Sequence, residues 1–187
     1  RSPVALSLVH ARLAGYRERL ADAGTEILIE GAPRVGLTYC VHAFVRAQGR
    51  PVRVATHTHL PASVLRAVRE RVPALVVIRD PAEALRSTLL RNRDLTIRAV
   101  LERYLAFYRC VERARDRVVL ADFEEVIADA GAVVERVNRR FGTRFLPYAR
   151  TAPDEAAVLA QLHERDRLLA LHPLGSLLPN PSKAEAR

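Results

Sequence analysis

The chain has 187 residues, which is enough for one domain with a hydrophobic core of its own, and no apolar run approaches the roughly 20 residues of a membrane-spanning helix. Apolar residues make up 49% of the chain and charged residues 27%, a composition typical of a globular protein. The formal net charge of +9 raises the local concentration of anions, so phosphates, nucleic acids, sulfated sugars and acidic membranes are candidate partners. Arg side chains spread over solvated helix faces would give the same charge.

The predicted elements alternate between helix and strand along the chain. Apolar residues at helical spacing, capping residues and following glycines predict helices over 4–22, 38–48, 62–72, 95–115, 130–141 and 154–171, with another opening at Asp80-Pro81. Short apolar runs predict strands over 26–30, 52–55, 74–78 and 118–121, and the Pro-rich tail 173–187 is expected to be irregular.

Apolar strand runs separated by helices indicate the class of the fold. They favour a central, mainly parallel sheet covered on both faces, which is a three-layer α/β/α architecture. Because the sequence has no internal repeat and no linker, residues 1–187 are expected to form a single domain.

Two kinds of functional segment are missing from the sequence. Aromatic residues are few, and no stretch interleaves Arg with aromatic side chains as binders of single-stranded nucleic acid do, so no specific nucleic-acid binding is expected. Arg1-Ser2-Pro3 leads into an amphipathic stretch and not into the apolar block and cleavage site of a signal peptide. Because the sequence contains no Met, even at position 1, the presence of a leader before Arg1 stays open.

The cysteines indicate a reducing environment. Cys40 and Cys110 lie 70 positions apart, each in a predicted helix, and have neither metal-ligand spacing nor the pattern of a disulfide framework. We expect both to be small buried apolar residues in a cytoplasmic protein. No His, Cys and Asp residues have the spacing of a metal site, so no metal is expected.

A loop suited to phosphate follows the first predicted strand. Segment 31–39 (GAPRVGLTY) joins strand 26–30 to a helix, so backbone N–H groups and the positive end of the helix meet at one place. Gly36 allows the backbone to approach closely, Arg34 brings a permanent positive charge, and the Thr38 hydroxyl can bond a phosphate oxygen. The Gly-Lys-Ser/Thr ending of a Walker A loop is missing. An ordinary strand-to-helix turn with a surface Arg is the alternative.

A second anion site is predicted after the third strand. Arg79 stands at the carboxyl end of this strand, where ligands bind in open α/β sheets, and Ser87 lies about two turns into the following helix. Asp80, Pro81 and Glu83 match the cap, the first position and the capping box of a helix start. Arg79 and Ser87 are therefore expected to lie close enough to bind the same phosphate. In the alternative interpretation Asp80 is a plain cap that pairs with Arg79, and Ser87 is a helix-surface residue.

Two histidines lie between these sites. If the segment after strand 52–55 stays extended, His57 and His59 leave one face of the sheet, and Thr56 and Thr58 leave the other. A His at the carboxyl end of a strand, beside a phosphate-bearing ligand, is suited to act as general base for an acceptor hydroxyl. A structural or merely exposed His is the alternative.

Taken in this order, the segments resemble motifs of the sulfotransferases that use 3′-phosphoadenosine 5′-phosphosulfate (PAPS), over roughly residues 26–145. GAPRVGLTY is similar to the family's 5′-phosphosulfate loop, Pro-Lys/Arg-Ser-Gly-Thr-Thr-Trp, and VVIRDPAEALRS is similar to its 3′-phosphate motif, with Arg79 and Ser87 eight positions apart. THTHLP resembles the Lys-Thr-His-Leu-Pro segment that carries the family's catalytic His, which maps onto His59. ADFEEV (121–126) resembles the family's Tyr-Glu-Asp-Leu turn.

This resemblance implies a P-loop-like nucleotide-binding topology and transfer of a sulfuryl group from PAPS to a hydroxyl or amine, with 3′,5′-adenosine bisphosphate (PAP) as product and no metal. His59 would take the proton from the acceptor, and Arg34 would stabilise negative charge on the phosphate side. The residues implied to bind the cofactor are Arg34, Val35, Gly36, Leu37, Thr38, Tyr39, Arg79 and Ser87. The basic surface favours an anionic acceptor among small molecules, carbohydrates and lipids, and the oligomeric state stays open.

The sequence departs from the family pattern at several positions. Val35 and Leu37 replace a Ser and a Thr, which removes two hydroxyls from the phosphosulfate loop, and His57 stands where the family often has Lys. No Arg-Lys-Gly segment occurs near the C-terminus, where Lys183 and Arg187 are candidate replacement cations.

Two other functions fit the sequence. A non-catalytic nucleotide- or polyanion-binding module would use the positive charge without chemistry. An ATP-dependent small-molecule kinase would use Asp80 to position Mg²⁺, although the Walker A ending is missing.

Overall fold

The computed structural model describes residues 20–170, and its central feature is a parallel sheet. Within these residues the sheet has the strand order β2-β1-β3-β4, with β1 (Ile27–Gly31), β2 (Val54–Thr56), β3 (Ala74–Ile78) and β4 (Val119–Asp122). All three strand pairs are parallel, so the predicted mainly parallel sheet is confirmed.

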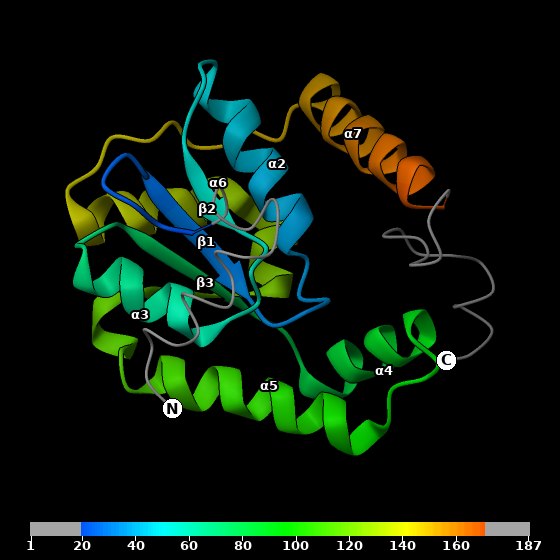
Figure 1. Ribbon diagram of the computed structural model, residues 1–187. Helices are drawn as coiled ribbons and strands as arrows, with labels where there is room; N and C mark the ends of the chain where they lie inside the picture. The colour runs from blue at the N-terminus through cyan, green and yellow to red at the C-terminus, as the bar shows by residue number, and fades with distance from the viewer. Residues whose placement is uncertain (1–19, 171–187) are drawn as a thin grey trace.

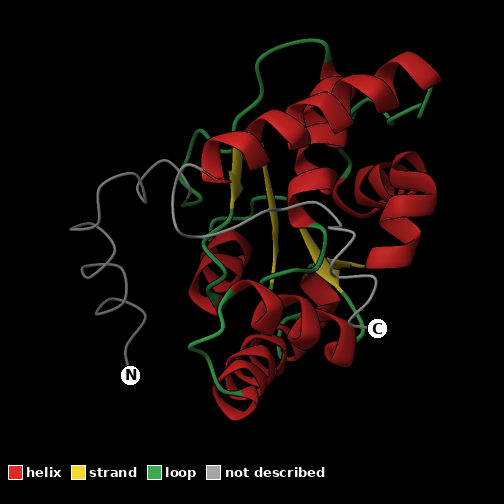
Figure 2. Ribbon diagram, turned by 90° about the vertical axis from the view of Figure 1, so that its right-hand side faces the viewer, coloured by secondary structure: helices red, strands yellow, loops and turns green. Residues whose placement is uncertain are grey.

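Helices cover both faces of the sheet (Figures 1 and 2). On one face α2 (Leu37–Gln48) packs against α6 (Phe123–Phe141), and α7 (Ala152–Ala170) packs against α2. On the other face α3 (Pro61–Arg69) packs against α5 (Ile97–Glu112). The remaining helix, α4 (Pro81–Arg91), contacts α5. The chain therefore has the predicted three-layer α/β/α architecture.

The burial of each strand follows its position in the sheet. The central strands β1 and β3 are buried almost throughout, which explains their continuous apolar runs. The edge strand β4 alternates buried and exposed residues, and β2 at the other edge is short and only partly buried. Side chains from both helical layers complete the main core, among them Phe44, Val64, Phe107 and Val137.

The structure differs most from the predicted boundaries at α6. This helix begins at Phe123, directly after β4, and not at residue 130. The Glu125 carboxylate accepts a hydrogen bond from the Asp122 N–H at 3.0 Å, which stabilises the first turn. Asp129, inside the helix, has φ −153° and ψ 82°, and its carboxylate accepts from the Ala132 N–H at 2.9 Å. Asp129 therefore caps a second start, and the predicted helix 130–141 is this second part.

The other predicted elements agree with the structure within a few residues where they are described. The predicted helix 4–22 lies outside the described residues except for 20–22, which are not helical, and the tail 173–187 lies wholly outside them. The predicted helix 95–115 ends earlier, at Glu112, and a short 3₁₀ helix (Arg115–Arg117) follows it. None of the helices described between residues 20 and 170 is both long and apolar enough to cross a membrane.

The two cysteines differ in their burial. Cys40 is buried as predicted, and burial raises the pKa of its thiol to about 12. Cys110 is only partly buried, so the prediction for it was wrong. The reason is its place on α5, whose core face carries Phe107 and Val111.

The chain connections change direction between β1 and β3, and the carboxyl ends at such a point are where ligands bind in open α/β sheets. From β1 the chain crosses through α2 to β2 on one side, whereas from β3 it crosses through α4 and α5 to β4 on the other. Where neighbouring strands lead away in opposite directions, their loops diverge and leave room for a ligand. Because the strands are parallel, all their carboxyl ends lie at this same edge, which we call the carboxyl edge.

Candidate functional site

The loop after β1 has an unusual backbone. Arg34 and Gly36 have φ values of 70° and 78°, in the left-handed region. Gly31 lies so close to β3 that an added Cβ would come within 2.6 Å of the Val77 carbonyl oxygen. Gly36 then begins α2 without a side-chain cap. The first N–H groups of α2 therefore remain available at the carboxyl edge, an arrangement that suits an anion.

The two predicted anion sites meet in the structure. The Arg34 Nε donates a hydrogen bond to the Ser87 Oγ at 3.0 Å, and the Arg79 Nη1 donates to the Arg34 carbonyl oxygen at 3.2 Å. Asp80 caps α4 as predicted, accepting from the Glu83 N–H at 3.0 Å. The Glu83 carboxylate lies 3.6 Å from the Arg79 guanidinium, so Arg79 pairs with a residue one turn along α4, since the Asp80 carboxylate is engaged at the helix start.

Arg79 lies between these elements and is mostly buried, with 16% of its side chain exposed. Its guanidinium carbon is 4.2 Å from the centroid of the Phe123 ring, a cation–π contact. A Cβ at Gly36 would come within 2.5 Å of the same ring, so Phe123 packs against both Gly36 and Arg79. Within the described part of the chain, the buried Arg79 Nε has no hydrogen-bond partner. This N–H is therefore an unsatisfied donor among the described residues.

The sequence analysis gave Phe123 no role of its own. The signal available was its position directly after the carboxyl end of β4, since residues at that position face the carboxyl edge.

The other residues of the loop motif differ in burial. Val35 and Leu37 are buried in the main core, with 0% and 4% exposure, so their backbone and not their side chains can contact a ligand at the carboxyl edge. Thr38 is partly buried, and its hydroxyl contacts a His ring. Tyr39 packs against a second core cluster that includes Ala43 and Val158, and burial raises the pKa of its phenol.

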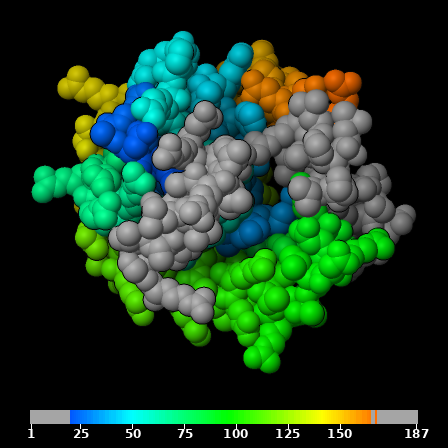
Figure 3. Space-filling model, in the orientation of Figure 1, coloured from blue at the N-terminus to red at the C-terminus, as the bar shows by residue number. Residues whose placement is uncertain are grey.

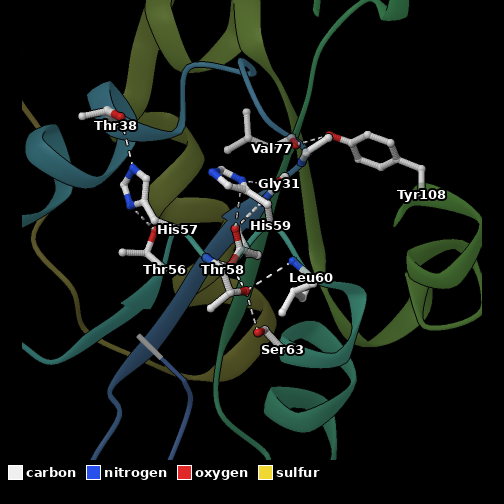
Figure 4. A network of polar contacts seen from close by, with 12 residues as sticks. Gly31, Thr38, Thr56, His57, Thr58, His59, Leu60, Ser63, Val77 and Tyr108 are labelled. Carbon is white, nitrogen blue, oxygen red and sulfur yellow. Dashed lines mark hydrogen bonds and ion pairs between the residues drawn. The ribbon is translucent and has the colours of Figure 1, made fainter. Parts of the chain in front are cut away.

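The two histidines do not continue the sheet. β2 ends at Thr56, and His57 and His59 both have positive φ values, of 58° and 53°. The segment is therefore not extended, and the condition under which both rings would leave one sheet face is not met, because this left-handed backbone breaks the alternation of a strand. The rings still lie near each other, with their centroids 6.0 Å apart (Figure 4). The His57 ring contacts two hydroxyls, Thr38 Oγ1 through Nε2 and Thr56 Oγ1 through Nδ1, each at 3.1 Å.

His59 has a defined hydrogen-bonding state. Its Nδ1 lies 2.9 Å from the Gly31 carbonyl oxygen. A carbonyl oxygen can only accept, so Nδ1 carries the proton and Nε2 of the neutral ring has a free lone pair. One third of the side chain (33%) is exposed, which lets a ligand reach the ring.

A buried carboxylate lies behind His59. Glu30, the fourth residue of β1, is 0% exposed, and its Oε1 lies 3.8 Å from the His59 Nδ1. Burial raises the pKa of the Glu30 carboxyl, while the positive charge of His59 and hydrogen bonds from Thr58 and Gly31 act against this rise. Glu30 was not among the predicted site residues. The available signal was a charged residue within a strand that is otherwise apolar and buried on both sides.

Two tyrosines of α5 hold the loop against β3. The Tyr108 hydroxyl donates to the Val77 carbonyl oxygen at 2.7 Å and accepts from the Ala32 N–H at 3.3 Å (Figure 4). The Tyr104 hydroxyl donates to the Arg79 carbonyl oxygen at 2.5 Å. Burial raises the pKa of both phenols, so they remain neutral donors at neutral pH. These contacts fix the ends of β1 and β3 relative to each other.

An apolar cavity of about 150 Å³ adjoins the loop between α4 and α5. Its lining is mostly apolar and includes Pro33, Leu85, Thr88, Leu95 and Tyr104. Since Pro33 precedes Arg34 and Thr88 follows Ser87, the cavity borders the contact between the two anion sites. Among residues 20–170, no three His, Cys, Asp or Glu side chains lie together as a metal site requires.

Comparisons with known proteins give a structural match. No protein-family model matches the sequence, and no curated protein matches it. Among solved structures, the protein is similar to mouse sulfotransferase SULT7A1 complexed with PAP, with a TM-score of 0.51 and 14% sequence identity over 78% of this chain and 67% of that chain. At this level of identity the likeness concerns the fold, and it shows that the chain shares the α/β fold of that sulfotransferase.

Proposed function

We propose that the protein is a sulfotransferase with PAPS as the sulfuryl donor. The observation that carries this proposal is the contact between the two phosphate motifs, from Arg34 to Ser87 and from Arg79 to the Arg34 carbonyl oxygen. PAPS carries its 3′-phosphate and its 5′-phosphosulfate on one ribose, so a site for it needs two anion-binding groups close together. The shared fold with a sulfotransferase that was solved with PAP supports the same proposal.

The residues at the carboxyl edge fit this cofactor. Arg34, Thr38 and the uncapped N–H groups of α2 would hold the 5′-phosphosulfate, and Arg79 and Ser87 would hold the 3′-phosphate. The buried Arg79 Nε, which has no partner among the described residues, would gain a charge-assisted hydrogen bond. When bound, PAPS supplies the sulfuryl group.

The side chains around the proposed cofactor position would have two roles in the reaction, proton transfer and stabilisation of negative charge. The His59 Nε2 would take the proton of an acceptor hydroxyl or amine, because Nδ1 is held by the Gly31 carbonyl. Arg34, Thr38 and the loop N–H groups would stabilise negative charge on the phosphate side. His57, in contact with Thr38, would add positive charge there when it is protonated.

The acceptor is proposed to be a small molecule, carbohydrate or lipid with an apolar part and a negative charge. The cavity beside Pro33 and Tyr104 would take the apolar part, and the net charge of +9 favours an anion.

The test is a calorimetric titration of the protein with PAP, with AMP and with ATP–Mg²⁺. We expect PAP to bind at least about 10-fold more tightly than AMP, since the 3′-phosphate adds charge-assisted hydrogen bonds. Arg79→Ala should weaken PAP binding by about 10- to 100-fold and leave AMP binding nearly unchanged. Arg98→Ala is the matched control, because Arg98 is 88% exposed on α5 and pairs with Glu102.

Equal binding of PAP and AMP would contradict the proposal. Preference for ATP–Mg²⁺ would favour a kinase, and the capping role of Asp80 in α4 argues against this. PAP binding that falls equally in Arg79→Ala and Arg98→Ala would indicate non-specific attraction of polyanions.

A further inference from the structure

We propose that Glu30 is a positioning residue that stabilises the protonated form of His59 during proton transfer. This inference rests on the proposed function, in which His59 is the general base. The comparisons and the sequence motifs assign no role to Glu30, which stands in the strand before the phosphate loop.

The geometry connects Glu30 to both sides of His59. Its Oε1 accepts from the Gly31 N–H at 3.1 Å, and its Oε2 accepts from the Thr58 N–H at 2.9 Å and from the Thr58 hydroxyl at 2.6 Å. The Thr58 hydroxyl in turn contacts the Ser63 Oγ at 2.6 Å (Figure 4). The Gly31 carbonyl also accepts the hydrogen bond from the His59 ring. The Glu30 carboxylate therefore binds both Thr58, which precedes His59, and Gly31, which orients the His59 ring.

A carboxylate buried in a strand is unfavourable unless a positive group compensates for it. The His59 Nδ1 lies 3.8 Å from Oε1, and the Glu30 side chain is 0% exposed. His59 forms an ion pair with Glu30 when its ring is protonated, so the carboxylate favours that form of the ring. In catalytic triads a carboxylate binds the imidazole of the catalytic His and fixes its tautomer. Here the Gly31 carbonyl fixes the tautomer of His59, and the Glu30 carboxylate acts only through its charge.

The negative charge of Glu30 acts on the step in which the acceptor loses its proton to His59. The acceptor oxygen forms a bond to sulfur, the bond from sulfur to the bridging phosphate oxygen breaks, and its electron pair leaves with the bisphosphate. The acceptor proton moves to the His59 Nε2, so the ring gains a positive charge while Nδ1 keeps its proton. Glu30 attracts this charge in the transition state more strongly than it attracts the neutral ring, which is the condition for a rate effect.

Other titratable groups face the pair. The His57 ring lies 6.0 Å from the His59 ring, so a proton on His57 opposes a proton on His59. From α5, the Tyr108 phenol interacts with the charge of Glu30, and burial keeps this phenol neutral at neutral pH. From α3, the group in contact is the uncharged Ser63 hydroxyl. Although burial raises its pKa, Glu30 accepts hydrogen bonds from Gly31 and Thr58 as an ionised carboxylate does, so we take it as the negative group of this cluster.

The test is an NMR titration of ¹⁵N-labelled histidine side chains in the whole protein, with the His59 signal assigned by its loss in His59→Gln. In Glu30→Gln, which keeps an oxygen acceptor for Thr58, we expect the ring signal to titrate at lower pH than in the parent protein, because the negative charge beside it is removed. Glu26→Gln is the matched control, since Glu26 precedes the same strand and pairs with Arg50 at the surface. The midpoint in this control should equal that of the parent protein.

A midpoint that is unchanged in Glu30→Gln, or that moves equally in Glu26→Gln, would overturn the inference. If Glu30→Gln does not fold, the parent protein decides: the ¹³C signal of the Glu30 carboxyl must respond at the midpoint of the ring, and independent titrations would refute the coupling. PAP affinity measured in the same samples tests the proposed function separately. If PAP binds normally and the His59 titration midpoint does not change in Glu30→Gln, the inference about Glu30 is refuted and the proposed function stands. If the midpoint changes but PAP does not bind, the proposed function is refuted and the inference about Glu30 stands.

Discussion

At the scale of single residues, the candidate site depends on a contact between Gly36, Phe123 and Arg79. Sequence motifs predicted that Arg34, Arg79 and Ser87 belong to one site, because each follows a strand or lies in the helix after it. Phe123 and Glu30 were not predictable in the same way. Their partners lie 87 positions away, at Gly36, and 28 positions away, at Thr58, and only the packing of the sheet brings them together.

Gly36→Ala tests this contact. An Ala at φ 78° is strained, and its Cβ would lie 2.5 Å from the Phe123 ring, so we expect a loss of about 2–5 kcal/mol in the free energy of unfolding. Gly49→Ala is the control, because Gly49 has φ 60° but nothing within 4 Å of an added Cβ, and it should lose only about 1–2 kcal/mol. Urea unfolding measures both. PAP affinity should fall only in Gly36→Ala, and equal losses in both variants would argue against a tight packing of Phe123.

At the scale of elements, the pattern of apolar residues predicted the central strands better than the helix starts. Ala74–Ile78 was predicted with the boundaries that the structure has, because a strand buried on both faces is a continuous apolar run. The start of α6 was not predicted, because the non-helical Asp129 separates its first turns from the regular helix that follows, and because polar contacts of Glu125 stabilise the first turn.

Glu125→Gln tests the polar start of α6. Hydrogen bonds from Arg136, and then from the Asp122 N–H, hold the pKa of the Glu125 carboxyl below its usual value. A lowered pKa in the folded state means that Glu125 stabilises the fold above its unfolded pKa, near about 4.3, and that this contribution is lost as the pH falls through the folded pKa.

We therefore expect Glu125→Gln to lower the free energy of unfolding at pH 7 by less than about 1 kcal/mol, because the pair is largely exposed, and to converge with the parent protein in acid. Urea unfolding at several pH values measures this difference. Glu124→Gln is the control, since Glu124 is the exposed neighbour in the same turn and should change stability little at any pH. A difference between Glu125→Gln and the parent that grows towards low pH would contradict the assignment.

At the scale of the whole molecule, the core has two parts. The main core surrounds the sheet, and a second cluster lies between α2, α6 and α7, with Ala43, Tyr148, Val158 and Leu162 among its residues. Figure 3 shows α7 in orange and the α4–α5 surface in green at different sides of the view. An ion pair between Arg46 and Asp154, at 2.9 Å, also joins α2 to α7. The second cluster therefore supports α2 from the side away from the sheet.

Val158→Ala tests whether this cluster stabilises the fold without shaping the site. Val158 is 0% exposed, so removing two methyl groups should lower the free energy of unfolding by about 1–3 kcal/mol. Leu159→Ala, at a neighbouring residue that is 40% exposed, should cost less than about 0.5 kcal/mol. Thermal unfolding gives the stabilities, and calorimetry should find PAP affinity unchanged within about twofold in both variants. A large loss of affinity in Val158→Ala would show that α7 shapes the site.

Gly31 links the Glu30–His59 pair to the loop after β1. Its N–H binds the Glu30 carboxylate, its carbonyl binds His59, and its missing side chain lets β1 lie against Val77. The proposed acid–base pair and the loop after β1 therefore share one residue, whose N–H and carbonyl belong to the two adjacent peptide units. If an anion in the loop changes the backbone conformation at Gly31 and with it the proton affinity of His59, thermodynamic linkage requires that the proton changes the affinity for the anion by the same factor. Anion binding and proton uptake would then be two coupled equilibria, and the coupling could be measured from either one.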